Sequence, residues 1–348
     1  MARSCAASSG SADPKRSLWS CLAGWWLARQ SWAVARRVLA VLVVLACVLA
    51  AGCGGQEPKA HRRPAVKTRR LAPIAEGPGR FVAIGNGRTL YMECVGSGSP
   101  AVVLEAGFGA DTLSWRDVQP EVGRGTRTCA YDRAGTGNSV APPGVRDARD
   151  EIADLRRLLA RARVEPPYVL VGHSYGGVLA RVFAHLYPSE TAGLVLIDTM
   201  GRDGRRRQLA IWPRSQAPEI RRGLATAVMD GVDLAAGEAI ASRVTSLGGL
   251  PLAVITAGRE DNFPRTPARL HRGLKRLWDG MQDELGALSE NSVHVVALAS
   301  NHDIPTGQPS VIVHAVQAVV DAARNHALLP PCRRLFSGPD VRCRGQQR

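Results

Sequence analysis

Short apolar runs alternate along the chain with longer segments whose apolar residues recur every three or four positions. The runs that predict buried strands cover residues 101–105, 127–131, 168–171, 193–197, 252–257 and 293–298. Ahead of them, residues 81–84 and 89–94 flank a Gly-Asn-Gly turn and predict a hairpin. A helix is predicted where Ile152, Leu155, Leu158 and Leu159 share one face. Strands that alternate with helices predict a mostly parallel sheet covered on both faces.

The strand at 168–171 runs directly into Gly172-His-Ser-Tyr-Gly176, and an apolar segment with helical character follows at 178–186. This is Gly-x-Ser-x-Gly in the strand, turn and helix setting that the motif requires. The turn is called the elbow below, and the helix that follows it the elbow helix. The two glycines leave room for a turn that crowds its own neighbours, and the turn holds its serine strained and exposed. An isolated pentapeptide of this kind would indicate only a Gly/Ser turn, but this setting indicates that Ser174 is a nucleophile.

Four motifs in this order resemble the α/β-hydrolase fold, and bacterial esterase-like members of that superfamily in particular. They are Leu104-Glu-Ala-Gly-Phe-Gly109, Tyr131-Asp-Arg-Ala-Gly-Thr-Gly-Asn-Ser139, Val171-Gly-His-Ser-Tyr-Gly-Gly177 and Asn301-His-Asp-Ile-Pro305. The resemblance implies a domain over residues 79–326 with a mostly parallel, eight-stranded sheet and helices on both faces. It also implies a small cap insertion at about 199–249.

A serine hydroxyl needs a base to take its proton, and in this fold the chain order is serine, acid, histidine. His302 follows the last predicted strand, which is the position expected of the base. His294 lies inside that strand and His314 lies in the next helix, so both are interpreted as structural or surface residues, and His173, beside the nucleophile, is interpreted as packing in the turn.

Two aspartates compete for the third role, which is to orient His302 and stabilise its imidazolium. Asp198 ends the strand after the elbow helix, and Asp261 follows the next strand. The later position is the commoner one in the superfamily, but the esterase-like members often keep their acid at the earlier one. Asp198 is therefore the preferred acid and Asp261 the alternative.

The oxyanion of a tetrahedral intermediate needs backbone donors. One is the N–H of Tyr175, directly after the nucleophile. By the resemblance, the other is the N–H of Phe108. Many relatives carry His-Gly before this donor where this chain has Ala106-Gly107, but a backbone donor does not depend on that histidine. Arg133 and its neighbour Asp132 are interpreted as fixing the turn after their strand.

The N-terminal segment 1–53 has the features of an export signal. A basic pair at 36–37 precedes an apolar run at 38–51, which is shorter than the about 20 residues of a membrane-spanning helix. Gly52-Cys53 follows, and the small residues before it resemble a bacterial lipobox, although Ala50 stands where leucine is commonest. Cys53 is therefore the expected lipidation site, and a simple signal peptide or an uncleaved anchor is the alternative. Each of these interpretations places the folded part outside the cytoplasm.

The segments on either side of that signal are unusual. Residues 1–33 form an atypically long extension, and translation that begins near Val34 is a hypothesis that would remove it. Residues 54–78 are rich in Gly, Pro and basic residues and read as a tether.

The 348 residues carry a net charge of +15, and 45% of them are apolar, which is enough for a sizeable core. The basic residues cluster at 59–70 and 202–207. No nucleic-acid motif accompanies them, so attraction to a membrane surface or simple solvation is the better interpretation.

Eight cysteines fall into two groups. Three precede Cys53 and are lost if the signal is cleaved: Cys5, Cys21 and Cys47. In the fold that the chain resembles, the second and fourth strands are neighbours, so Cys94 and Cys129 could pair. Cys332 and Cys343 would close a short loop in a basic tail at 327–348. No clustered Cys/His spacing predicts a zinc site.

The function implied is hydrolysis of a carboxylic ester through an acyl-enzyme on Ser174, without a cofactor. An amidase, peptidase, thioesterase or C–C bond hydrolase would use the same triad, so small-molecule esters and amides are both candidate substrates. A surface lipoprotein that kept the fold as a binding module is the rival of another class.

Overall fold

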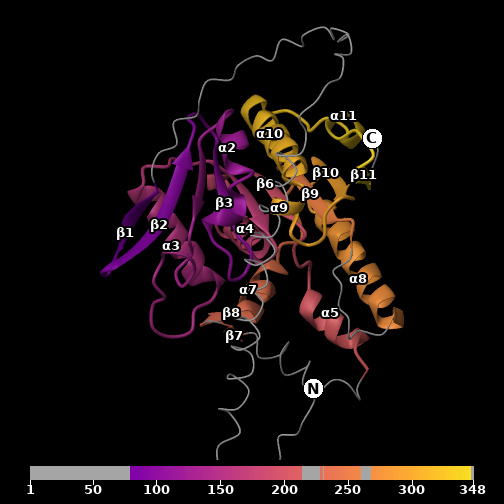
Figure 1. Ribbon diagram of the computed structural model, residues 1–348, viewed down its shortest axis with the longest axis horizontal. Helices are drawn as coiled ribbons and strands as arrows, with labels where there is room; N and C mark the ends of the chain where they lie inside the picture. The colour runs from indigo at the N-terminus through magenta and orange to yellow at the C-terminus, as the bar shows by residue number, and fades with distance from the viewer. Residues whose placement is uncertain (1–78, 214–227, 230, 260–267, 346–348) are drawn as a thin grey trace, which may run out of the picture. The chain divides into compact units, whose positions relative to one another are not determined.

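The computed structural model describes residues 79–213, 228–229, 231–259 and 268–345. Its centre is a nine-stranded sheet in the order β1-β2-β4-β3-β5-β6-β9-β10-β11 (Figure 1). These strands are β1 (Arg80–Gly85), β2 (Arg88–Val95), β3 (Ala101–Glu105), β4 (Thr128–Tyr131), β5 (Tyr168–His173), β6 (Thr191–Ile197), β9 (Leu252–Ala257), β10 (Ser292–Ala297) and β11 (Val341–Arg344). The central strands pair in parallel, and the antiparallel pairs β1–β2, β2–β4 and β10–β11 lie toward the edges.

The central strands are buried on both faces, which is why they read as unbroken apolar runs instead of alternating ones. Every residue of β3, β4, β5 and β9 is buried. One core cluster contains residues of α3 (Ala148–Arg161), α4 (Tyr175–Leu186) and α7 (Leu234–Ala241). The other contains residues of α2 (Gln119–Gly123) and α10 (Pro309–Asn325). Helices therefore cover both faces of the sheet.

The remaining short elements connect these layers. They are η1 (Thr112–Trp115), η2 (Pro188–Glu190), α5 (Gly204–Ile211), α9 (Ile304–Gly307), α11 (Cys332–Leu335) and the two-stranded ribbon of β7 (Val228–Met229) and β8 (Val232–Asp233). The long helix α8 (Ala268–Gly286) precedes β10. In the part of the chain described, no helix is long and apolar enough to cross a membrane.

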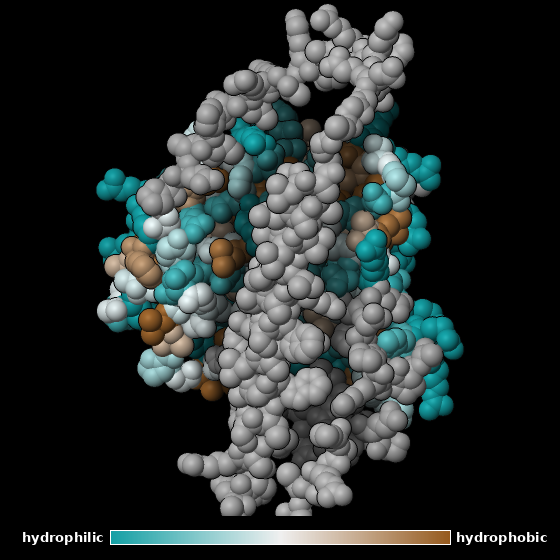
Figure 2. Space-filling model, in the orientation of Figure 1, coloured by the Kyte–Doolittle hydropathy of each residue, from teal (hydrophilic) through white to brown (hydrophobic). Residues whose placement is uncertain are grey.

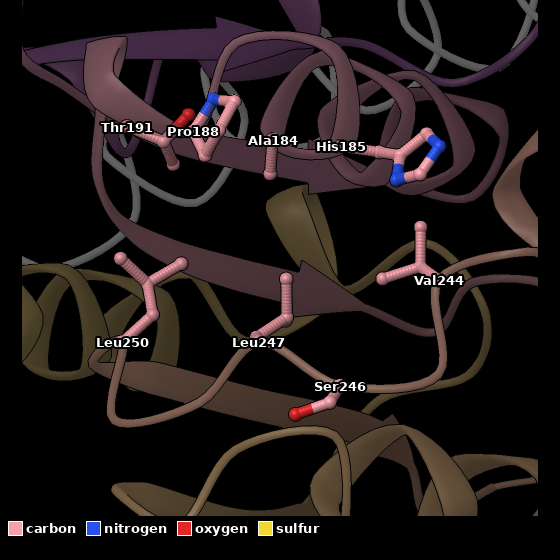
Figure 3. A pocket seen from close by; sticks show the side chains of 8 residues that line it. All are labelled: Ala184, His185, Pro188, Thr191, Val244, Ser246, Leu247 and Leu250. Atoms are coloured by element: carbon pink, nitrogen blue, oxygen red, sulfur yellow. The ribbon is translucent and has the colours of Figure 1, made fainter.

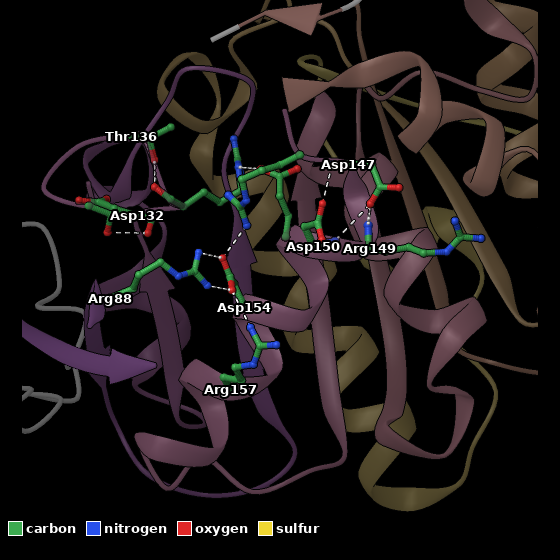
Figure 4. A network of polar contacts seen from close by, with 12 residues as sticks. Arg88, Asp132, Thr136, Asp147, Arg149, Asp150, Asp154 and Arg157 are labelled. Carbon is green, nitrogen blue, oxygen red and sulfur yellow. Dashed lines mark hydrogen bonds and ion pairs between the residues drawn. The ribbon is translucent and has the colours of Figure 1, made fainter. Parts of the chain in front are cut away.

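Helix α3 is anchored at both its start and its middle (Figure 4). Its first turn has a capping box, in which Asp147 accepts from the Asp150 N–H and Asp150 accepts from the Asp147 N–H at 3.0 Å. Further along, the carboxylate of Asp154 accepts from Arg88 on β2 at 2.9 Å. These contacts tie the antiparallel end of the sheet to the helix that covers it.

The C-terminal tail joins the sheet, which therefore has one strand more than the eight expected. Strand β11 pairs antiparallel with β10, and the Cys332–Cys343 disulfide closes the segment before it. Phe336 is buried against the same core as α10. The other expected pairing is also present: Cys94 and Cys129 are opposite residues of β2 and β4 and form a disulfide.

The region expected to be a cap insertion supplies α5, the β7–β8 ribbon and α7. Helix α7 packs on the helix that follows the nucleophile: a Cβ added at Gly237 would lie 3.5 Å from the Tyr175 hydroxyl. In the view of Figure 2, the described surface is mostly hydrophilic, and its apolar residues form separate spots.

Candidate active site

Ser174 occupies a strained turn between β5 and α4. Its φ of +53° is in the left-handed half of conformational space, which residues other than glycine rarely adopt. Hydrogen bonds hold the turn: the Ser174 N–H donates to the Ile197 carbonyl at 2.9 Å, and the Ser174 carbonyl accepts from the Thr199 hydroxyl at 2.6 Å. The strain is therefore maintained by the neighbouring strand β6 and the residues that follow it.

The glycines around Ser174 are required by close backbone contacts. A Cβ at Gly172 would lie 2.4 Å from the Gly176 carbonyl oxygen, and one at Gly176 would lie 2.1 Å from the Glu105 carbonyl oxygen. Both distances are far below van der Waals contact. The Gly-x-Ser-x-Gly spacing is thus a steric condition for bringing the elbow against β3.

Asp198 and His302 meet at the same edge of the sheet. Parallel strands β5 and β6 are neighbours, so Ser174 and Asp198 directly follow adjacent carboxyl ends. His302 lies in the loop between β10 and α9. The His302 Nδ1 atom is 2.7 Å from the Asp198 Oδ2 atom.

The carboxylate of Asp198 is held on its other oxygen as well. Asp198 is only 3% exposed, and its φ of +42° is strained like that of Ser174. Its Oδ1 atom accepts from the Ala257 N–H at 3.1 Å and from the Trp278 indole N–H at 2.8 Å. The alternative acid, Asp261, lies outside the described residues.

His173 supports the loop that carries His302. Its Nε2 atom is 2.8 Å from the His302 carbonyl oxygen, and a carbonyl can only accept, so Nε2 carries the proton. Burial, together with the nearby His302 ring, lowers the pKa of His173 to about 4, so His173 is neutral at pH 7. The structural role expected for His173 agrees with these contacts.

The other two histidines lie away from Ser174. Burial on β10 lowers the pKa of His294 to about 4, and its Nε2 atom is 2.7 Å from the Thr256 hydroxyl. His314 is exposed on α10.

The two expected oxyanion donors flank the nucleophile. Tyr175 begins α4 directly after Ser174, and the Phe108 ring packs edge-on against the Tyr175 ring with centroids 6.1 Å apart. The preceding loop is close to the serine, because a Cβ at Gly107 would lie 3.6 Å from the Ser174 Cβ. Among the described residues, no acceptor is hydrogen-bonded to the N–H of Phe108 or of Tyr175. Both donors can therefore serve a substrate oxygen.

Comparison with known proteins agrees with this geometry. Residues 100–222 match the model of the α/β-hydrolase fold family. A solved meta-cleavage product hydrolase from Pseudomonas fluorescens has a TM-score of 0.51 at 18% identity, over 72% of this chain and 98% of that chain. The chain has the α/β-hydrolase fold.

Two relatives from sequence comparison add detail. The protein YqjL of Bacillus subtilis is 27% identical over 236 residues, which are 67% of this chain and 88% of that protein. A 2-hydroxy-6-oxo-2,4-heptadienoate hydrolase of Pseudomonas putida is 35% identical over 130 residues, which are 35% of this chain and 45% of that protein. The chain is thus similar to most of the length of YqjL, and to less than half of the length of the Pseudomonas putida hydrolase.

Arg133 holds the loop that leads to Phe108, a contact that was not predicted from the sequence. Its side chain is 4% exposed, and it donates to the carbonyls of Ala106 at 2.7 Å and Gly107 at 2.5 Å. These carbonyls directly precede Phe108. The sequence predicts that both Asp132 and Arg133 fix the turn after β4. Asp132 does so, because its carboxylate accepts from the N–H groups of Thr112 and Asn138, each at 2.8 Å.

Two buried carboxylates balance the charge of Arg133. Glu105 lies 3.6 Å from its Nη1 atom, and Glu151 lies 3.6 Å from its Nε atom. The Tyr175 hydroxyl donates to Glu151 at 2.6 Å, so the network also reaches the second oxyanion residue. Burial raises the pKa of Glu105 to about 7, although Arg133 opposes the shift.

We expect Arg133→Met to lower kcat by about 100-fold, because the loop before Phe108 loses both its hydrogen bonds and its alignment with the oxyanion. The substitution should also cost about 3 kcal/mol of unfolding free energy, because it leaves buried carboxylates without their cation. Ester kinetics and thermal denaturation measure the two effects.

Arg157→Met is the matched control for that substitution. Its side chain is 52% exposed, and its partner Asp154 is buried but keeps its ion pairs with Arg88 and Arg146, so both kcat and stability should stay close to those of the wild type. An Arg133→Met enzyme with wild-type kcat would show that the loop keeps its position without the guanidinium.

A surface cavity lies near the start of β6 (Figure 3). It has a volume of about 410 Å³ and is lined by the end of α4, the start of β6 and residues 244–250. Its polar side chains are His185, Thr191 and Ser246. Because Thr191 begins β6 whereas Asp198 follows its end, this cavity is remote from the triad.

Proposed function

We propose that the hydrolase cleaves carboxylic esters through an acyl-enzyme on Ser174, with His302 as general base and Asp198 as the third member of the triad. The observation that carries the proposal is the 2.7 Å contact between His302 Nδ1 and Asp198 Oδ2 at the sheet edge where the strained Ser174 lies. Elbow, base and acid then stand in the roles of a serine hydrolase triad.

In the first half-reaction, His302 Nε2 takes the Ser174 hydroxyl proton as Oγ bonds to the ester carbonyl carbon. The carbonyl oxygen becomes an oxyanion and accepts from the backbone N–H groups of Phe108 and Tyr175. Asp198 stays ionised and stabilises the imidazolium. When the C–O bond to the alcohol breaks, His302 returns the proton to the leaving oxygen and the acyl group remains on Ser174.

In the second half-reaction, water replaces the alcohol. His302 takes a proton from the water as its oxygen bonds to the acyl carbon, and the second tetrahedral intermediate uses the same two N–H donors. Its collapse breaks the bond to Ser174 Oγ, which regains its proton from His302. The His302 side chain is 37% exposed, so a substrate and a water molecule can reach it.

A fluorophosphonate probe tests the proposal. Wild-type protein should gain one covalent adduct at Ser174, and Ser174→Ala should gain none. An unlabelled wild type with native circular dichroism would favour a non-catalytic binding module instead.

Cleavage of a carbon–carbon bond is the second candidate, because the Pseudomonas putida relative is a hydrolase of 2-hydroxy-6-oxo-2,4-heptadienoate. The same triad would serve a vinylogous 1,5-diketone. A panel of nitrophenyl esters, aminoacyl amides and such diketones separates the candidates: the highest kcat/KM identifies the class of bond.

We further propose that the protein is exported and anchored by a lipid on Cys53. Four cysteines of the described domain form two disulfides, which supports an oxidising compartment. The apolar run and small residues ahead of Cys53 support lipidation over simple secretion.

Cys53→Ala should move the enzyme from the membrane fraction to the soluble fraction of a bacterial host and abolish incorporation of a labelled fatty acid. Cys332→Ala is the control, because that cysteine is disulfide-bonded in the domain and should leave lipid incorporation unchanged. Equal labelling of wild type and Cys53→Ala would contradict the proposed anchor.

A further inference from the structure

Trp278 on helix α8 touches two members of the proposed triad. It lies on α8, between β9 and β10 in the chain. Its indole N–H donates to Asp198 Oδ1 at 2.8 Å, and its ring meets the His302 ring edge-on, with centroids 6.3 Å apart. Trp278 thus contacts the Asp198 oxygen that does not face His302, and its ring also borders the His302 ring.

One turn further along α8, Gln282 holds Thr199, the residue that directly follows Asp198. The side-chain amide of Gln282 donates to the Thr199 carbonyl at 2.7 Å, and Gln282 is fully buried. Thr199 in turn donates its hydroxyl to the Ser174 carbonyl. Helix α8 is therefore connected to the acid directly and to the nucleophile through Thr199.

The geometry at Asp198 needs such support. A non-glycine residue at a φ of +42° is strained, and it persists only where its surroundings fix it. The backbone of Asp198 donates to the Ile255 carbonyl at 2.7 Å, but its side chain can still rotate about two bonds. Two N–H donors on Oδ1, from Ala257 and Trp278, leave Oδ2 directed at His302.

We infer that Trp278 is a positioning residue that fixes the Asp198 carboxylate and moderates the negative charge that this carboxylate presents to His302. This inference rests on the proposed function, because it assigns Asp198 and His302 to the triad. An N–H donor draws charge toward Oδ1, so its removal concentrates charge on Oδ2 and favours the imidazolium. Trp278 therefore sets both the orientation of the base and the pH at which it becomes protonated.

Several titratable or charged residues of the described elements lie near the His302 loop, including Arg259, whose backbone N–H donates to the Ser300 carbonyl. His173 on β5 is neutral at pH 7, Asp198 follows β6, and Asp303 is the next residue in the chain. On α8, Asp279 pairs with Lys275 and also with Arg344 at 3.3 Å. The control substitution must therefore leave these charges and the Asp198 carboxylate unchanged.

Trp278→Phe keeps an aromatic ring and removes the N–H, which makes it the variant of choice. We expect kcat for a nitrophenyl ester to fall about tenfold with KM little changed, because a hydrogen bond to a charged group is lost while the substrate contacts remain. The acid limb of the kcat/KM profile should move about half a unit toward higher pH.

Gln282→Met is the matched control on the same helix face. It removes a hydrogen bond to the Thr199 backbone and leaves the Asp198 carboxylate untouched. We expect a lower Tm and an acid limb at the wild-type pH. A shift of equal size in both variants would show that general loosening of α8 is responsible, and it would overturn the role given to the indole N–H.

A measurement without turnover separates this inference from the proposed function. In a Ser174→Ala background, an NMR titration of ¹³C-labelled histidine gives the midpoint of His302, assigned by its absence in His302→Gln. The midpoint should rise when Trp278→Phe is added, and an unchanged midpoint would overturn the inference. If the wild type hydrolyses no substrate and takes no fluorophosphonate label, the proposed function fails, whereas the titration still decides whether Trp278 controls His302.

Discussion

Ser174→Ala is expected to lower kcat for carboxylic esters by about a millionfold, because the substitution removes the only atom that His302 can activate for attack from this turn. The oxyanion donors are backbone groups of Phe108 and Tyr175, so they survive, and a weak residual rate above the uncatalysed reaction should remain. KM should change little, since the methyl side chain fits the same turn. Steady-state kinetics at enzyme concentrations high enough to detect the residual rate provides the measurement.

Ser246→Ala is a suitable control for that experiment. Ser246 lines the cavity near the start of β6, and its hydroxyl accepts from the Gly248 N–H at 3.1 Å. Its loss should leave kcat at the wild-type value. If Ser174→Ala kept a tenth of the wild-type turnover, another nucleophile would be responsible and the elbow would have only a structural role.

Much of the fold was predictable because hydrophobic periodicity and turn chemistry are local properties. The buried strands from 101 to 297 appear in the sequence as apolar runs, and the elbow appears as two glycines whose spacing is a steric necessity. The tail strand β11 was not predictable in this way. It is a short edge strand whose pairing with β10 joins residues more than 40 positions apart, and the predicted Cys332–Cys343 disulfide closes only a short loop and does not indicate that pairing.

The site was predictable only where a residue is marked by its position relative to a strand. Ser174 and His302 have such marks, and the sequence left Asp198 and Asp261 as alternatives for the same reason: each follows a strand. Arg133 and Trp278 have none. A buried arginine looks like a turn residue in sequence, and a tryptophan on an amphipathic helix reads as core packing, so only tertiary contacts indicate that they support the oxyanion loop and the acid.

The choice of acid leads to the second large effect: Asp198→Asn should lower kcat by about 10,000-fold. The carboxylate accepts the His302 Nδ1 proton at 2.7 Å, and that hydrogen bond leaves Nε2 free to accept the serine proton. An asparagine held by the N–H donors of Ala257 and Trp278 keeps its carbonyl oxygen on them and turns its NH₂ group toward His302. The imidazole would then carry its proton on Nε2 and could not act as a base.

The matched variant is Asp261→Asn, because it makes the same chemical change at the competing position. Since Asp198 already accepts from His302 Nδ1, we expect Asp261→Asn to keep kcat within about threefold of the wild type, as substitutions outside a triad usually do. The loss in Asp198→Asn should also be smaller at high pH, where hydroxide can replace the general base in deacylation, whereas the Asp261→Asn profile should follow the wild type. A large loss in Asp261→Asn together with a mild one in Asp198→Asn would reverse the assignment and would mean that His302 turns to a different carboxylate during turnover.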